Sequence, residues 1–181
     1  MSHGRNYDIA FVGLKPGTHV FEYEIQDEFF SEFPKQDFRN CQAHVKLTLD
    51  KHSNFLQLTF EIGGKLELDC DRCGNSLPLE LWDEFKVLVK MTEDPEAMNE
   101  EEEDPDVYYI SRTESHLHLV PWIYEFINLS VPMQRQCSEE MMGGPYCNLE
   151  VLAKLKEMEA QKKAEANPLW KGLEKFKASK K

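Results

Sequence analysis

An alternation of apolar and polar side chains between residues 41 and 90 restricts the fold of this chain more than any other feature. Apolar residues recur at every second position, as they do in a strand that buries one of its faces. Gly63-Gly64 is typical of a two-residue hairpin turn and would end one strand and begin the next. The pattern therefore predicts an antiparallel meander. Its strands are expected at residues 9–14, 19–25, 41–50, 55–62, 65–70, 77–89 and 107–111.

Helical spacing appears in the second half of the chain. Residues 119–131 place apolar side chains three and four positions apart and predict one central amphipathic helix. Residues 148–166 and 169–181 predict two further helices, which Asn167-Pro168 separates. We therefore expect an α+β protein in which an antiparallel sheet, curved or partly closed, carries a central helix and C-terminal helices.

Charge is distributed unevenly along the chain. Lys and Arg total 21 against 33 Asp and Glu, and the net charge of -12 excludes a generally basic nucleic-acid coat. Residues 93–106 contain nine acidic residues and no basic one, which predicts a disordered acidic loop. From residue 154 onward nine Lys and four Glu give +5, which leaves -17 for the rest. We therefore expect a β-rich domain over residues 1–150 and a basic helical tail over 151–181.

Targeting signals are not evident in the sequence. It has no run of about 18 apolar residues that would span a membrane, and residues 1–17 lack the apolar core of a secretory signal. Both observations predict a cytoplasmic protein with no membrane partner. In that reducing compartment, five cysteines indicate metal ligands or free thiols rather than a disulfide framework.

The sharpest local motif is Cys70-Asp-Arg-Cys73-Gly74, which lies between two predicted strands. Two thiolates in such a turn can bind one tetrahedral metal ion, and the glycine permits the twist that the turn requires. Cys137 and Cys147 would complete the ligands of one structural zinc ion, although their C-x9-C spacing is wider than usual. Reduced buried thiols, a redox dithiol and a site that has lost its metal remain as alternatives.

Catalytic motifs are missing from the sequence, which contains neither a nucleophile elbow nor a glycine-rich phosphate loop. The many carboxylates make chance pairs abundant, so no acidic pair is diagnostic. We therefore expect a non-enzymatic protein without a small-molecule substrate. An enzyme with a thiol or metal-hydrolytic centre is the alternative.

The order of motifs over roughly residues 40–178 resembles the YceD family, the large ribosomal RNA subunit accumulation proteins. The resemblance rests on LDCDRCGNSLPLEL, the acidic stretch, LHLVPWIYEFINLSVPM, a later cysteine and NPLWKGLEKFK. The positions that match the motifs are Cys70, Arg72, Cys73, Cys137, Asn167, Pro168 and Trp170.

The resemblance implies a ribosome biogenesis factor that supports accumulation or processing of 23S ribosomal RNA. Its partner would be the large-subunit RNA precursor, which lysines of the basic tail would contact. The candidate lysines are Lys162, Lys163, Lys171, Lys175, Lys177, Lys180 and Lys181. Alternatively, the acidic loop and the acidic body would make the protein an escort for a basic ribosomal protein such as L32, a role that fits the net charge better.

Overall fold

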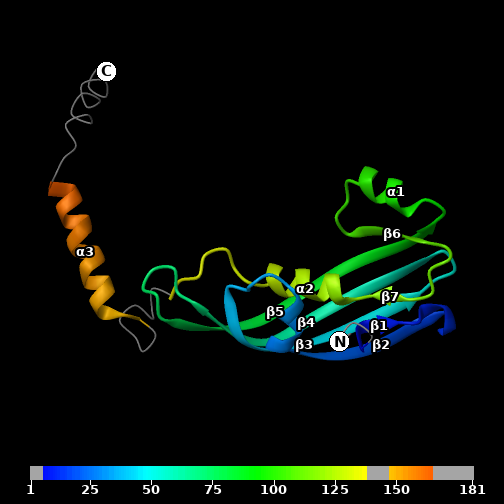
Figure 1. Ribbon diagram of the computed structural model, residues 1–181, viewed down its shortest axis with the longest axis horizontal. Helices are drawn as coiled ribbons and strands as arrows, with labels where there is room; N and C mark the ends of the chain where they lie inside the picture. Colours follow the sequence, from blue (N-terminus) through cyan, green and yellow to red (C-terminus); the bar gives the residue numbers. More distant parts are fainter. Residues whose placement is uncertain (1–5, 138–146, 165–181) are drawn as a thin grey trace, which may run out of the picture. The chain divides into compact units, whose positions relative to one another are not determined.

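The computed structural model of this protein describes residues 6–137 and 147–164, which form a mixed α+β fold (Figure 1). The elements in chain order are β1 (Asp8–Ile9), η2 (Phe11–Gly13), β2 (Gly17–Gln26), η3 (Asp27–Glu32), β3 (Phe38–Lys51), β4 (Phe55–Asp69), β5 (Ser76–Thr92), α1 (Pro95–Glu101), β6 (Val107–Ser111), β7 (Leu117–His118), α2 (Val120–Leu129) and α3 (Leu149–Ala164). None of the helices in these residues has both the length and the apolar character needed to cross a membrane.

The main sheet has five strands in the order β2-β3-β4-β5-β6, and β1 and β7 form a separate two-stranded sheet. β3 pairs antiparallel with both β2 and β4, whereas β6 runs parallel to β5. The sheet is not closed, because β2 and β6 are its two edges. The expectation of a partly closed sheet is therefore wrong. Residues 9–14, expected as one strand, contain the end of β1 followed by η2.

Gly63-Gly64 lies inside β4 and is not a hairpin turn, so the two strands predicted at 55–62 and 65–70 are one. Opposite these glycines the register of β3 shifts between Arg39 and Gln42, which marks a β-bulge. Gly64 has a φ of 129°, and the Cβ atom of any other residue at this position would collide with the carbonyl oxygen of Gln42. The bulge therefore requires glycine at position 64, and this requirement explains a glycine pair in the middle of a strand.

One face of the main sheet is buried and the other faces solvent. Along β3 and β4 buried residues such as Leu47 and Phe60 alternate with more exposed ones such as Lys46 and Glu61. α2 covers the buried face, and its Phe126 ring lies 5.1 Å from Phe60 (Figure 1). The predicted alternation is thus confirmed, and the segment 119–131 contains a helix, α2, at Val120–Leu129.

The acidic segment 93–106 contains α1, in contrast to the disordered loop that its charge predicts. The Asp94 side chain accepts a hydrogen bond from the Ala97 N–H at 3.3 Å, and Pro95 occupies the first turn. The Asn99 side chain then holds the helix on β6, because it donates to the Tyr109 carbonyl at 2.9 Å and accepts from the Tyr109 N–H at 2.8 Å. Local capping and this amide pair outweigh the repulsion between the carboxylates.

The chain divides into two compact units, and each is described by itself. The first unit comprises Met1–Leu68 and Pro78–Met133 and contains both sheets, α1 and α2. The second comprises Asp69–Leu77 and Gln134–Lys181 and contains the turn between β4 and β5 together with α3. The expected domain division after residue 150 rests on the charge of the tail and stays a prediction.

We expect Gly64→Ala to lower the free energy of unfolding by about 2 kcal/mol or more, because its methyl group would collide with the β3 backbone at a positive φ. The matched variant is Gly63→Ala, whose Cβ would meet no atom within 4 Å, and its stability should change by less than about 1 kcal/mol. Urea unfolding followed by circular dichroism measures both. Equal stability of the two variants would contradict the bulge.

Candidate metal centre

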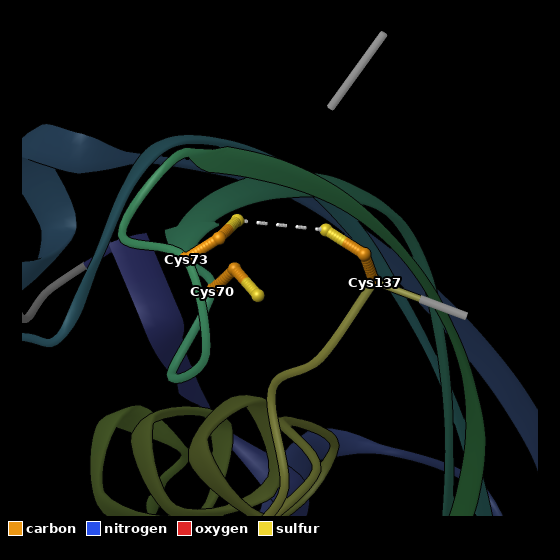
Figure 2. Close-up of side chains that lie close together, drawn as sticks. All are labelled: Cys70, Cys73 and Cys137. Atoms are coloured by element: carbon orange, nitrogen blue, oxygen red, sulfur yellow. Dashed lines mark hydrogen bonds between the residues drawn. The ribbon is translucent and has the colours of Figure 1, made fainter. Parts of the chain in front are cut away.

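Three cysteines gather in the second unit. Cys70 and Cys73 come from the turn between β4 and β5, and Cys137 comes from the chain that follows α2. All three are buried, their Sγ atoms lie within 4.8 Å of one another, and Figure 2 shows the three side chains facing a common space. The Sγ atoms of Cys73 and Cys137 are 4.0 Å apart. Cysteines separated by more than sixty positions in the sequence therefore form one cluster.

The turn that carries Cys70 and Cys73 is closed by backbone hydrogen bonds. The Gly74 N–H donates to the Cys70 carbonyl at 2.8 Å, and the Cys70 N–H donates to the Asn75 carbonyl at 2.9 Å. Gly74 has a φ of 74°, in the left-handed region that glycine adopts without strain. The role predicted for the glycine after the second cysteine is thus confirmed.

Asp71 joins this turn to the segment that carries Cys137. Its N–H donates to the Arg135 carbonyl at 2.7 Å, and its carboxylate accepts from the Arg135 N–H at 2.9 Å. Arg135 lies two residues before Cys137, so this pair of bonds fixes the approach of the third thiol. Asp71 is a positioning residue that the sequence analysis missed, since nothing in the sequence links it to Arg135.

Two thiols of the cluster, those of Cys70 and Cys137, differ strongly in acidity. Burial raises the pKa of Cys70, but N–H groups of Cys137, Cys73 and Arg72 point at its sulfur and together lower that pKa to about 7. Burial and the neighbouring sulfurs raise the pKa of Cys137 to about 12. Burial likewise raises the pKa of Cys41, in β3, to about 11. The cluster therefore favours a thiolate at Cys70 and a neutral thiol at Cys137 unless a cation compensates the charge.

The donor set and its spacing fit a metal ion. A tetrahedral zinc ion with Zn–S bonds of about 2.3 Å places its sulfur ligands about 3.8 Å apart. The observed 4.0 Å between Cys73 and Cys137 is close to that value and far above the roughly 2.05 Å of a disulfide. N–H groups directed at a ligand sulfur are also typical of metal sites. The three cysteines could thus hold a metal ion, as the sequence predicts.

Cys147 and Leu152 complete the surroundings of the cluster. Cys147 is a free cysteine that is partly buried and packs against the cluster, and its thiol is hydrogen-bonded to the Cys137 thiol. Asn148 caps α3, since its side chain accepts from the Val151 N–H at 3.3 Å, and Leu152 in the first turns of that helix packs against the three cysteines. The cluster therefore lies at the start of α3.

Other predicted site residues lie away from the cluster or outside the described residues. Arg72 is exposed in the turn between the two cysteines. Lys162 and Lys163 belong to the C-terminal end of α3. The predicted residues outside the described ranges are Asn167, Pro168, Trp170, Lys171, Lys175, Lys177, Lys180 and Lys181.

The fold and the cluster define a class: a small α+β protein with a buried three-cysteine cluster suited to a metal ion. Residues 58–177 match the family model described as "Large ribosomal RNA subunit accumulation protein YceD". The match covers more than half of the chain, and the protein therefore belongs to the YceD family. No curated protein and no solved structure gave a significant match. The family name implies a role in the accumulation of large-subunit ribosomal RNA and describes no enzyme.

We expect Cys73→Ser to abolish metal binding and Asp71→Ala to weaken it by about tenfold, because Asp71 orients the segment of Cys137. Asp71→Asn keeps a carbonyl acceptor for the Arg135 N–H, and its metal affinity should lie between those of the wild-type protein and Asp71→Ala. Titration with cobalt(II), followed by its thiolate absorption bands, and metal analysis of the purified protein measure the effects. Cys41→Ala, which removes a buried thiol outside the cluster, should retain the metal. Full metal content in Cys73→Ser would contradict the site.

Proposed function

We propose that this protein is a non-enzymatic factor of large-subunit biogenesis that contacts precursor 23S ribosomal RNA and thereby supports its accumulation. The family match carries this proposal. The matched residues 58–177 include the cysteine cluster, α3 and part of the basic segment beyond it. RNA contact through a local basic segment is compatible with a strongly acidic chain, because the phosphate backbone responds to the charge nearest to it.

The contact with RNA would lie in the basic tail. From residue 154 onward the chain carries +5, while the preceding residues carry -17. Lysines would bind the phosphates, and Trp170 would stack on a base. The acidic remainder of the chain would be repelled by the phosphates and so would leave the tail as the preferred contact.

The metal of the cluster would be one structural zinc ion, which Cys70, Cys73, Cys137 and Cys147 would bind. Four thiolates favour zinc over harder cations, and a closed set of four protein ligands leaves no position for a substrate. The zinc would join the turn at Asp69–Leu77 to the start of α3, within one unit. Leu152 packs on the cysteines, so metal binding would fix the helix that leads into the basic tail.

We expect glutamine at four lysine positions of the tail to weaken binding to a large-subunit precursor RNA fragment by at least about tenfold. The slope of log affinity against log salt concentration should become shallower by about one unit for each phosphate contact that is lost. The variant replaces Lys171, Lys175, Lys177 and Lys180. Filter binding over a series of salt concentrations measures affinity and slope together.

The control changes the net charge equally at exposed lysines of the first unit. It replaces Lys15, Lys35, Lys65 and Lys86. Its affinity should fall by less than about threefold, since these lysines would make no phosphate contact. An unchanged salt slope in the tail variant would contradict RNA binding by the tail.

A second candidate function is the escort of a basic ribosomal protein. The observation in its favour is the fixed form of the acidic segment: α1 buries none of its residues and is held on the sheet edge by Asn99. Among the described residues, no salt bridge engages its carboxylates. A basic client would find these charges already ordered and unpaired, which lowers the entropy cost of binding.

We expect charge removal from the acidic segment to weaken binding of purified ribosomal protein L32 by about tenfold at low salt. The variant replaces Glu93, Glu96, Glu100, Glu101 and Glu103 by glutamine. A control with the same charge change replaces the exposed residues Glu22, Glu28, Glu32, Glu80 and Glu150. Calorimetry measures both, and full retention of L32 by the first variant would rule out the escort function.

A further inference from the structure

A groove of about 280 Å³ opens in the first unit between α1, β6 and the start of α2. Glu96 and Asn99 of α1 form one wall, and Tyr108 of β6, Glu114 of the following turn and Trp122 of α2 line the rest. The groove takes no part in the cysteine cluster or the basic tail. It therefore needs an explanation of its own.

Two aromatic rings form a corner in this groove. The centroids of Tyr108 and Trp122 lie 5.5 Å apart, and the ring planes meet at 85°. Tyr108 is 44% exposed, although it belongs to a sheet strand. Trp122 also packs against Phe60, and the centroids of these two rings lie 6.2 Å apart. An exposed ring beside a fixed ring offers π-faces to a cation or to a flat group.

The charge of the groove selects a cation. Glu96 and Glu114 line it, and neither forms a salt bridge among the described residues. No lysine or arginine lines the groove. Of its two histidines, His118 is hydrogen-bonded to the Asp8 carboxylate at 2.9 Å and His116 to the Ser115 hydroxyl at 2.8 Å. The remaining carboxylates of α1 add to this field. Phosphate groups would be repelled here, whereas a cationic side chain would meet unpaired carboxylates.

The walls of the groove are fixed before any ligand arrives. The amide of Asn99 exchanges two hydrogen bonds with the backbone of Tyr109, at 2.8 and 2.9 Å. The Tyr109 hydroxyl also donates to the Glu102 carboxylate at 3.0 Å. Tyr109 of β6 is therefore linked to α1 and its C-terminal end through both its backbone and its hydroxyl group. Because the groove is already ordered, ligand binding would cost little conformational entropy.

We propose that this groove binds an arginine side chain from a basic segment of a partner protein. The guanidinium group is flat, so it stacks on Tyr108 while its N–H groups donate to the carboxylates of Glu96 and Glu114. A lysine ammonium has no flat face and binds more weakly. The proposal rests on the escort function for the class of partner, and it adds the place and the side chain that the acidic segment recognises.

The test uses the full-length protein and a fluorescein-labelled Gly/Ser peptide with evenly spaced arginines. Matched peptides carry citrulline, which has the same shape without the charge, or lysine. Fluorescence anisotropy at low salt measures the affinity of each variant. Tyr108→Ala should weaken binding of the arginine peptide by about fivefold, and Tyr108→Phe should bind it as the wild-type protein does. Trp82→Ala removes a ring that is 90% exposed outside the groove and should leave the affinity unchanged.

Two double variants separate the groove from the general charge of the segment. Glu96→Gln with Glu114→Gln should weaken the arginine peptide by about tenfold, because both carboxylates would contact the guanidinium. Glu93→Gln with Glu101→Gln makes the same change of charge outside the groove and should weaken it by less than about threefold. This pair decides the question even if Tyr108→Ala does not fold.

Four outcomes would overturn the proposal that the groove binds arginine. The wild-type protein could fail to bind the arginine peptide, or it could bind the citrulline peptide equally well. The two double variants could lose affinity for the arginine peptide equally, or Trp82→Ala could lose more affinity than Tyr108→Ala. The two double variants could lose affinity equally while the variant with five replaced glutamates loses L32. The escort function would then remain without arginine binding in the groove. If the variant with five replaced glutamates still binds L32 fully, the escort function itself is excluded.

Discussion

Phe126 of α2 packs between two aromatic side chains of the main sheet, and this contact holds the helix to the face that the strands bury. Its ring stacks on Phe85 of β5 at 4.5 Å and meets Phe60 of β4 edge-on at 5.1 Å. A buried phenylalanine of this kind contributes about 3–5 kcal/mol. Trp122, one turn earlier on the same helix, is placed against Tyr108 by that packing. The placement of α2 on the main sheet thus depends on the packing of Phe126.

The sequence predicts the regular parts of this fold well, because burial of one face leaves a period of two along β3 and β4. It fails at Gly63-Gly64, where a glycine pair has the same appearance in a turn and in a bulge, and only the shifted register of β3 distinguishes the two. The prediction of disorder also fails at α1, because it rests on charge alone. Charge does not reveal that Asp94 caps the helix or that Asn99 forms a hydrogen bond with β6, which follows in the chain.

The cysteines of the cluster can be predicted from the sequence, but the residues that support them cannot. The spacing of Cys70 and Cys73 limits the chemistry to a few possibilities, and Cys137 and Cys147 are the candidates for further ligands. The bonds between Asp71 and Arg135, and the packing of Leu152 on the sulfurs, join positions far apart in the sequence. Such partners carry no local signature, since any acidic or apolar residue would look the same in the sequence.

The amide of Asn99 occupies the position that a sixth strand would take beside β6. Tyr109 presents its N–H and carbonyl to the free edge, and a single side chain satisfies both. A strand edge without such a partner is a template on which another chain can add and fibrils can grow. A short helix rich in like charges therefore also acts as a guard against polymerisation, since it blocks the edge sterically and repels a second copy electrostatically.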